Sequence, residues 1–372
     1  MTILITGDFS PRRDLPPYDP FTQKIKDIFC NSYTIVNLET PLTEKGAPIL
    51  KTGKNFRCSP KYAEILKNAG VDCVTLANNH IRDYGDVGVI DTISYCNNAG
   101  LDVVGAGENI EEARKPIIID RDNKDIAIFN YCEKEFSIAK HNRIGANPFD
   151  VVNAYYDINS YKKKVDRIII IYHGGIEYQH YPTIEMVKNF HFLIDAGADV
   201  IIAHHTHIYS GYEIYKGKLI YYGLGNFFAY SKNNKINSKW YKGILAEIDI
   251  KLIDRISYFI TKYNGKSLNI DIMEHNEIVE DRKLIEDISK NVLDINFLFS
   301  MWEKEYCKQT HSILRALQSS SNIQQKIFKL FPFLTPKLTN YRLINWLNIL
   351  QCDSHRNKAI NVLENLYQKR DD

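Results

Sequence analysis

Residues 198–207 read ADVIIAHHTH, a short apolar run that ends in three histidines. The segment before it, TIEMVKNFHFLIDAG at residues 183–197, has the apolar spacing of a helix and ends in glycine. A helix that leads directly into an apolar strand predicts a βαβ unit of a largely parallel sheet. Because such sheets bind ligands at the carboxyl ends of their strands, the histidines stand where a functional site is expected.

The same alternation of strands and helices continues toward the N-terminus. Short apolar runs predict strands at residues 1–6, 33–38, 71–77, 101–104, 126–131, 167–172 and 200–203. Helices are predicted at residues 21–30, 61–69 and 87–97. After the histidines the pattern changes, because YEIYKGKLIYYG at 212–223 predicts a hairpin with its turn at Lys216 and Gly217. Two further strands are predicted at 244–253 and 256–263.

The C-terminal part of the chain has a different character. From about residue 276 the sequence becomes helical and contains no glycine. We therefore expect two regions, residues 1–275 and residues 276–372. The expected fold class is α/β, with mixed sheet layers flanked by helices and an α-helical C-terminal extension.

The composition excludes several classes of protein. A hydrophobic content of 44% and a charged content of 25% are typical of a globular chain. A net charge of +2 provides no overall attraction to nucleic acid, so no nucleic-acid partner is expected. Seven scattered cysteines without a CxxC pair favour reduced thiols. Because Met1 leads directly into the first expected strand and no apolar run could span a bilayer, we expect a cytoplasmic protein without a signal peptide.

Polar residues with metal-binding or acid–base chemistry follow five of the predicted strands. They are Asp8; Asn37 and Glu39; Asn78, Asn79, His80 and Asp83; His173 and Glu177; and His204, His205 and His207. Each of them has an ordinary explanation, since such residues often cap helices, form turns or are simply exposed. Their occurrence after five separate strands favours one shared site.

The residue types predict which cations this site would bind. Carboxylate and amide oxygens from Asp8, Glu39 and Asn79, mixed with imidazoles, suit Mn, Fe or Zn. No cysteine is close in sequence, which argues against a structural Cys–zinc site. At a turning strand end, His205 and His207 could reach two adjacent metals, whereas strand alternation predicts that His204 points away.

The motifs together resemble a known family. ITGD (5–8), NLETPLT (37–43), FRCSP (56–60), LANNHIRDYG (76–85), YHGGIEYQHYP (172–182) and the stretch from ADVIIAHHTH to GNFF (198–228) carry the resemblance. In order and spacing they resemble the CapA family of bacterial capsule and poly-γ-glutamate synthesis proteins, itself similar to the calcineurin-like metallophosphoesterases. The resemblance implies a metallophosphoesterase-like catalytic domain over residues 1–275.

The resemblance also implies the roles of particular residues. Asp8 and His207 would bind a first metal, Asn79, His173 and His205 a second metal, and Glu39 would bridge the two. His80 would be the general acid and Asp83 would orient it. Arg57, Glu177 and Asn226 would face the substrate. One position departs from the wider phosphoesterase pattern: Ser10 stands where a histidine ligand is usual, which would weaken the first metal site.

The expected function is a hydrolase that uses two divalent metal ions (Mn, Fe or Zn). A phosphoesterase of capsule, surface-polysaccharide or poly-γ-glutamate biosynthesis is the primary hypothesis, because phosphoryl transfer depends mainly on charge stabilisation and positioning. Two alternatives remain: an amide or ester metallohydrolase of a capsule polymer, and a non-catalytic assembly factor of a polymer synthase. The expected partner is an anionic or phosphorylated polymer or precursor.

Residues 306–352 contain no acidic residue. They carry six positive charges around apolar stretches: Lys308, Arg315, Lys326, Lys329, Lys337 and Arg342. One interpretation is a helical segment that packs on the rest of the protein. The other is peripheral contact with the inner membrane or a membrane-bound synthase, because cations beside apolar residues favour an anionic lipid surface.

Overall fold

The computed structural model describes residues 2–12, 16–51, 53–230, 238–263, 268–318 and 322–331, together with the single positions 346, 350 and 363. The chain divides into two compact units, Met1–Ser300 and Met301–Asp372. The first unit includes α7 (Val279–Val292), the first helix of the predicted C-terminal region. The predicted boundary at residue 275 remains a prediction.

The first sheet of the N-terminal unit is built around β1 (Thr2–Ser10). On one side, parallel strands follow in the order β2 (Ser32–Leu38), β3 (Cys73–Thr75) and β4 (Asp102–Val104). On the other side, β14 (Lys242–Asp249), β15 (Tyr258–Tyr263) and β16 (Ile270–Ile272) are antiparallel. The end of β1 also pairs in parallel with β13 (Asn226–Ala229), so this sheet is mixed.

The second sheet has six strands in the order β11-β12-β10-β9-β7-β6. They are β6 (Ile117–Asp120), β7 (Asp125–Cys132), β9 (Arg167–His173), β10 (Val200–His204), β11 (Tyr212–Tyr215) and β12 (Lys218–Tyr221). The last two form the predicted hairpin, with positive φ angles at Lys216 (51°) and Gly217 (73°). Two positive φ angles are what a two-residue hairpin turn of the primed type requires.

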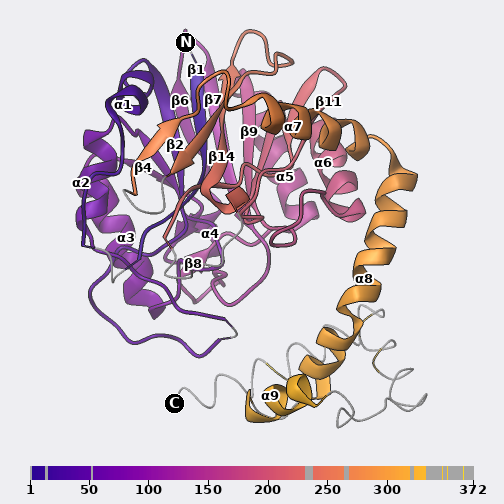
Figure 1. The fold of residues 1–372 in the computed structure, drawn as a ribbon. Helices are drawn as coiled ribbons and strands as arrows, with labels where there is room; N and C mark the ends of the chain where they lie inside the picture. The colour runs from indigo at the N-terminus through magenta and orange to yellow at the C-terminus, as the bar shows by residue number, and fades with distance from the viewer. Residues whose placement is uncertain are drawn as a thin grey trace. The chain divides into compact units, whose positions relative to one another are not determined.

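The two sheets pack face to face, with helices on their outer sides (Figure 1). Buried residues of both sheets, such as Ile3, Ile35, Ile171 and Ile202, form one apolar cluster between them. Alternate residues such as Leu4 face a second cluster beneath the helices α1 (Gln23–Phe29), α2 (Lys61–Asn68) and α3 (Gly85–Asn98). Helices α5 (Val151–Tyr161) and α6 (Ile184–Ala196) pack together beside the second sheet. The predicted fold class is thus confirmed.

Smaller elements complete the N-terminal unit. They are β5 (Ala106–Gly107), α4 (Ile110–Ala113), β8 (Gly145–Ala146) and the 3-10 turn η1 (Ser238–Tyr241). The carboxylate of Asp281 anchors α7, because it accepts hydrogen bonds from Tyr209 (2.5 Å) and from Lys242 (2.6 Å). The six described cysteines are free.

The C-terminal extension is helical where it is described. Helix α8 (Ile295–Gln318) begins in the first unit and continues in the second, where α9 (Asn322–Leu330) follows. Most of the basic segment 331–352, including Lys337 and Arg342, lies outside the described residues. Among the described residues, we found no helix with the length and apolarity needed to cross a bilayer.

Candidate metal centre

Residues at the carboxyl ends of the two sheets' parallel strands converge on one site. The first sheet contributes Asp8, Glu39 and Asn79, and the second contributes His173, His205 and His207. Ligand atoms of Glu39, His173 and His205 lie within 4.8 Å of one another, and the same holds for Asp8, Glu39 and His207. Glu39 belongs to both groups. The arrangement therefore offers two adjacent cation positions that share one carboxylate.

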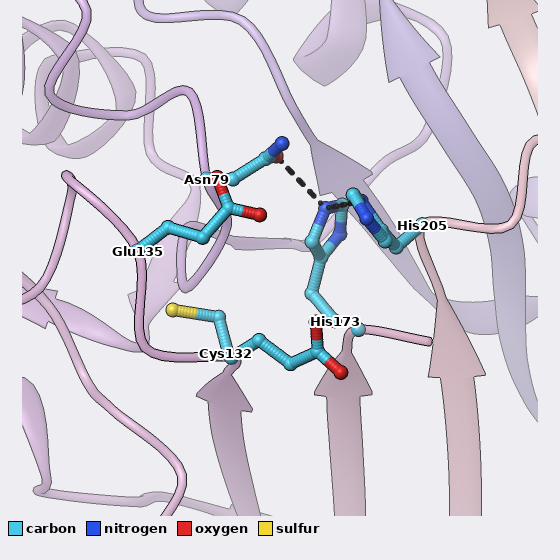
Figure 2. Close-up of a pocket in the computed structure, with 7 residues that line it drawn as sticks. Asn79, Cys132, Glu135, His173 and His205 are labelled. Carbon is cyan, nitrogen blue, oxygen red and sulfur yellow. Dashed lines mark hydrogen bonds between the residues drawn. The ribbon is translucent and has the colours of Figure 1, made fainter. Parts of the chain in front are cut away.

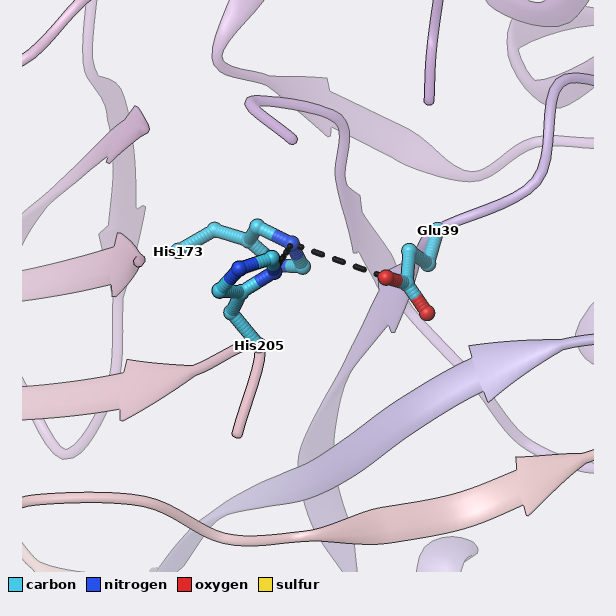
Figure 3. Close-up of side chains that lie close together, drawn as sticks. All are labelled: Glu39, His173 and His205. Atoms are coloured by element: carbon cyan, nitrogen blue, oxygen red, sulfur yellow. Dashed lines mark hydrogen bonds and ion pairs between the residues drawn. The ribbon is translucent and has the colours of Figure 1, made fainter. Parts of the chain in front are cut away.

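The first group surrounds the Nε2 atom of His173. This atom lies 3.2 Å from Asn79 Oδ1, 3.2 Å from His205 Nδ1 and 3.6 Å from Glu39 Oε1. Figure 3 shows His173, His205 and Glu39 turned toward one another. Ligand atoms around a cation with bonds of about 2.0–2.2 Å have a similar separation.

The second group lies beside it. Asp8 Oδ2 is 3.5 Å from His207 Nδ1, and Glu39 Oε1 is 3.8 Å from His207 Nε2. Ser10 is fully buried, and its hydroxyl lies 2.8 Å from that of Thr40. This group thus contains three acidic or imidazole ligands, as expected for a site in which serine replaces histidine.

The state of Glu39 tests whether the site fits a cation. Both carboxylate oxygens are buried and lack a hydrogen-bond partner among the described residues. Burial and the nearby charge of Asp8 raise the pKa of Glu39 to about 8. A buried carboxylate without partners is costly, and a divalent cation would remove this cost. Mixed carboxylate, amide and imidazole ligands fit a divalent metal, although they do not identify the ion.

The three histidines differ in pKa. Burial opposes the charged form of His207, but the charges of Glu39 and Asp8 outweigh it and raise the pKa of His207. His173 and His205 instead favour the neutral state that metal binding requires. Burial is the main cause that lowers the pKa of both His173 and His205, and neighbouring imidazoles lower it further. Neutral imidazoles can donate their lone pairs to a metal. For Asp8, burial raises the pKa, but the hydrogen bond and charge of His204 outweigh it and hold the pKa below its ordinary value.

The loop after β10 has an unusual backbone. His205 and His207 have φ angles of 84° and 57°, in the left-handed region that non-glycine residues rarely adopt. Such conformations cost on the order of 1–3 kcal/mol each and are concentrated at functional sites. The turn at His205 brings both histidines to the same centre.

His204 does not lie where strand alternation predicts it. The side chain does not point away from the site: it is fully buried, and its Nδ1 lies 3.1 Å from Asp8 Oδ1. In β10, Ile202 faces the space between the sheets, and His204 follows two residues later on the same face. His204 is therefore placed to hold the Asp8 carboxylate.

Asn37 and Asn226 also hold the ligands in place. Asn37 Nδ2 donates to Asp8 Oδ1 (2.7 Å) and lies 3.1 Å from His173 Nδ1. Asn226 is fully buried, and its Nδ2 donates to the backbone oxygens of His207 and Trp240. The Asn226 Oδ1 must then accept the Nδ1 proton of His207 (3.0 Å), which leaves Nε2 available to a metal. Asn226 thus lies behind a ligand rather than on the expected substrate side.

His80 and Asp83 form a buried pair next to the ligand Asn79. His80 Nδ1 lies 2.6 Å from Asp83 Oδ2, as expected if Asp83 orients the ring. Asp83 also accepts the Phe56 N–H (2.7 Å) and pairs with the buried ammonium of Lys51. Burial lowers the pKa of His80 to about 4, although Asp83 opposes this shift.

Comparison with known proteins identifies the family. Residues 2–231 match the family described as bacterial capsule synthesis protein PGA_cap. The chain belongs to this capsule synthesis family. The PGA biosynthesis protein CapA of Bacillus subtilis (strain 168) is 32% identical over 215 residues, which are 56% of either chain. The capsule biosynthesis protein CapA of Bacillus anthracis is 32% identical over 206 residues, 53% of this chain and 50% of the relative.

The chain spans about half the length of the curated relatives that it matches. Among solved structures, a hypothetical protein from Thermus thermophilus has a TM-score of 0.43 at 14% identity, over 70% of this chain and 99% of that chain. A 5'-nucleotidase from Candida albicans has a TM-score of 0.42 at 12% identity, over 72% and 52% of the two chains. At these scores neither structure bears on the chemistry of the site.

Arg57 and Glu177, the other two residues expected to face the substrate, lie in different surroundings. Arg57 Nη1 donates to the Lys45 carbonyl (3.1 Å), and its guanidinium lies 4.3 Å from the centre of the Tyr84 ring. Nothing in these contacts brings Arg57 to the ligands. Glu177 is exposed, and its charge acts on Glu39 and on the histidine ligands, which places it beside the centre.

A pocket beside the second position contains residues that the sequence did not suggest. Asn79, Cys132, Glu133, Glu135, His173, Gly174 and His205 line it (Figure 2). Cys132 reaches the ligands because β7 pairs with β9 in a register that places it opposite His173. Cys132 is distant in sequence from the candidate ligands, and strand pairing alone brings it to their pocket. Burial raises the pKa of the Cys132 thiol, so it stays protonated and is a poor ligand.

Proposed function

We propose that this capsule synthesis protein is a metal-dependent phosphoesterase that acts on a phosphorylated precursor of a bacterial surface polymer. The observation that carries the proposal is the position of Glu39, whose carboxylate has no hydrogen-bond partner and belongs to two adjacent ligand groups among the described residues. A pair of cations bridged by one carboxylate suits hydrolysis of an ester with a charged transition state. The relatives' names, PGA and capsule biosynthesis, suggest the polymer context.

The mechanism depends on the described residues as follows. Asp8, Glu39, Asn79 and the three histidines would hold two divalent ions of the Mn, Fe or Zn type. When bound, these ions would supply Lewis-acid activation of water and neutralise charge on the attacked group. The chain's own contribution is to fix the geometry before substrate arrives, through buried partners such as Asn37, His204 and Asn226.

His80 would protonate the leaving oxygen. Its Nδ1 faces Asp83, so the other ring nitrogen, Nε2, is the one that could donate to a substrate. The ring is neutral near pH 7 because burial lowers its pKa to about 4. A phosphate anion beside the ring would favour the charged imidazolium and thus load the acid when substrate is present. The positive charges of Lys51 and Arg12 both act on the His80 imidazole, so either could contribute to binding an anionic substrate.

Metal content and turnover together test the proposal. The purified protein, equilibrated with Mn²⁺, Fe²⁺ or Zn²⁺, is expected to retain about two ions per chain. It is also expected to hydrolyse at least one member of a panel of sugar, lipid-linked and aryl phosphoesters. Retained metal with hydrolysis only of amide or carboxylic ester bonds would favour the amide or ester hydrolase. Retained metal without turnover of any substrate would favour the non-catalytic assembly factor of a synthase.

A further inference from the structure

Tyr178 has an unusual backbone for an exposed aromatic residue beside the candidate metal centre. It follows His173 in the HGGIEY loop, and 56% of its surface is exposed. Its φ angle is 63°, and its N–H donates to the Thr206 carbonyl of the neighbouring loop (2.8 Å). A bulky residue in the left-handed region is strained, so the surrounding structure must hold the backbone of Tyr178 in this conformation.

The Tyr178 ring continues an aromatic surface that begins at a ligand. Its centre is 6.0 Å from that of His207 and 5.9 Å from that of Trp240, with which it is stacked at 26°. Trp240 is buried, its ring lies 4.9 Å from His207, and its Nε1 donates to the Ala229 carbonyl (3.0 Å). Trp240 is thus a fixed support, and Tyr178 is the exposed surface in front of it.

Carboxylates lie on both sides of the candidate metal centre. Glu177 precedes Tyr178 and is exposed, while Glu133 and Glu135 line the pocket at the other cation position. Burial and the charges of Glu177 and Glu39 raise the pKa of Tyr178 to about 12, so its hydroxyl remains a neutral donor. Carboxylates accept hydrogen bonds from hydroxyl groups, whereas they repel other carboxylates.

We propose that Tyr178, supported by Trp240, stacks against a sugar ring of the substrate, with Glu177 as acceptor for ring hydroxyls. The substrate class is then a phosphorylated sugar or glycan rather than a γ-linked glutamate polymer, which has no ring to stack on Tyr178. This assignment rests on the proposed phosphoesterase function. It deepens that function by naming the group that lies beside the cleaved phosphate.

Exposed tyrosines elsewhere on the protein provide a control. Tyr156 on α5 is 64% exposed and belongs to a regular helix, with no left-handed backbone. Tyr156→Ala therefore matches the loss of an exposed phenol without touching the site. Tyr178→Phe keeps the ring, and Tyr178→Gly removes it while permitting the left-handed backbone. Because glycine can keep the loop conformation, the effect of Tyr178→Gly comes from the loss of the ring and not from a collapse of the loop.

The experiment compares glucose 1-phosphate with glycerol 3-phosphate, which lacks a ring, and with penta-γ-glutamate. Turnover is measured on the Mn²⁺-equilibrated protein, and binding by isothermal titration calorimetry. Tyr178→Gly and Tyr178→Ala should raise KM or Kd for glucose 1-phosphate about tenfold more than for glycerol 3-phosphate, the size of one lost aromatic contact. Tyr178→Phe and Tyr156→Ala should not change this ratio, and penta-γ-glutamate should not compete.

The outcomes separate the two proposals. Binding of glucose 1-phosphate that depends on Tyr178, without turnover of any phosphoester, would support the sugar contact and contradict the phosphoesterase. Turnover with an unchanged ratio in Tyr178→Gly would retain the phosphoesterase and overturn the sugar contact. Competition by penta-γ-glutamate without binding of glucose 1-phosphate would overturn it as well.

Discussion

The imidazole of His80 and the carboxylate of Asp83 are buried together, with Nδ1 and Oδ2 2.6 Å apart. The Phe56 ring, whose centre is 4.5 Å from that of His80, covers the imidazole. The side chain is therefore held in one orientation before any substrate binds. A proton donor fixed in this way can act only on a leaving group that reaches its free nitrogen.

The first prediction concerns this donor. His80→Ala should retain bound metal and lose about 10²–10⁴-fold in turnover of alkyl phosphoesters, whose leaving groups need a proton. An activated aryl phosphoester should lose much less. Steady-state kinetics and metal analysis on both substrates measure the difference. His141→Ala is the control, because the His141 side chain is 90% exposed and pairs with Glu111, away from the ligands. Equal losses on both substrates would exclude His80 as the acid.

The second prediction concerns the buried pair of Lys51 and Asp83, whose side chains are 4% and 0% exposed. Lys51→Met or Asp83→Asn alone should destabilise the protein by about 3–5 kcal/mol, because each removes one partner of a buried ion pair. The double variant should be less destabilised than the sum of the two. Urea unfolding measures all three. The exposed pair Lys216 and Asp195, also in contact, should show a coupling below about 1 kcal/mol. Additive effects at Lys51 and Asp83 would contradict the prediction.

The third prediction concerns pH and metal removal. The folded-state pKa of Glu39 is raised from 4.5 to about 8. The stabilising contribution of its protonated form is therefore complete below about pH 4.5 and is lost as the pH rises through 8. Metal-free protein should lose Tm over this range relative to Glu39→Gln, which does not titrate. Added Mn²⁺ should raise the Tm of the wild type at pH 8, but not the Tm of Glu39→Gln. Parallel Tm curves for the two metal-free proteins would contradict this account.

The fourth prediction concerns Asn226. Asn226→Ala removes the acceptor that fixes the His207 ring, so metal affinity should fall about 10–100-fold. Asn147→Ala is the control, since Asn147 is equally buried and its Nδ2 donates to the Asn130 carbonyl (2.9 Å). Both variants should be less stable, but only the first should bind Mn²⁺ more weakly in calorimetry. If Asn226→Ala and Asn147→Ala bound Mn²⁺ with the same affinity, Asn226 would contribute only to stability.

The fifth prediction concerns residues 306–352, which we propose as a peripheral contact with anionic lipid. The full chain should sediment with anionic vesicles at low salt, and much less with neutral vesicles or at high salt, because its cations act through a screened attraction. Replacing Lys308, Lys326 and Lys329 by Gln should weaken this sedimentation. Equal sedimentation with both kinds of vesicle at low salt would leave only a packing role for the segment.

The sequence predicted the elements whose signals are local. The hairpin at Lys216 and Gly217 and the strands that lead to His173 and His205 follow from short-range patterns, and the structure confirms them. Asp8 was expected to follow a strand that ends at residue 6. The strand β1 instead continues to Ser10, so Asp8 lies inside it, at an irregularity in its pairing with β2 and β13. A local distortion caused by two neighbouring strands has no signal in a single segment.

The supporting residues were harder to predict for a similar reason. Cys132 ends a strand that carries no motif and Glu133 follows it, and only the pairing of that strand beside β9 brings them to the site. The side chain of Lys51 is buried against Asp83, which is 32 positions away in the sequence. A polar residue in a loop gives no indication of which distant charge it will meet.

The two sheets each contribute half of the candidate ligands, the carboxylates and the amide from one and the imidazoles from the other. Neither half can hold a metal pair by itself. During synthesis, β1, β2, β3 and β4 are complete by residue 104, while β9 and the histidine loop emerge some 70 to 100 residues later. A nascent or partly unfolded chain therefore lacks half of the candidate ligands and cannot form the complete site. Metal binding would then show that the two sheets have packed together.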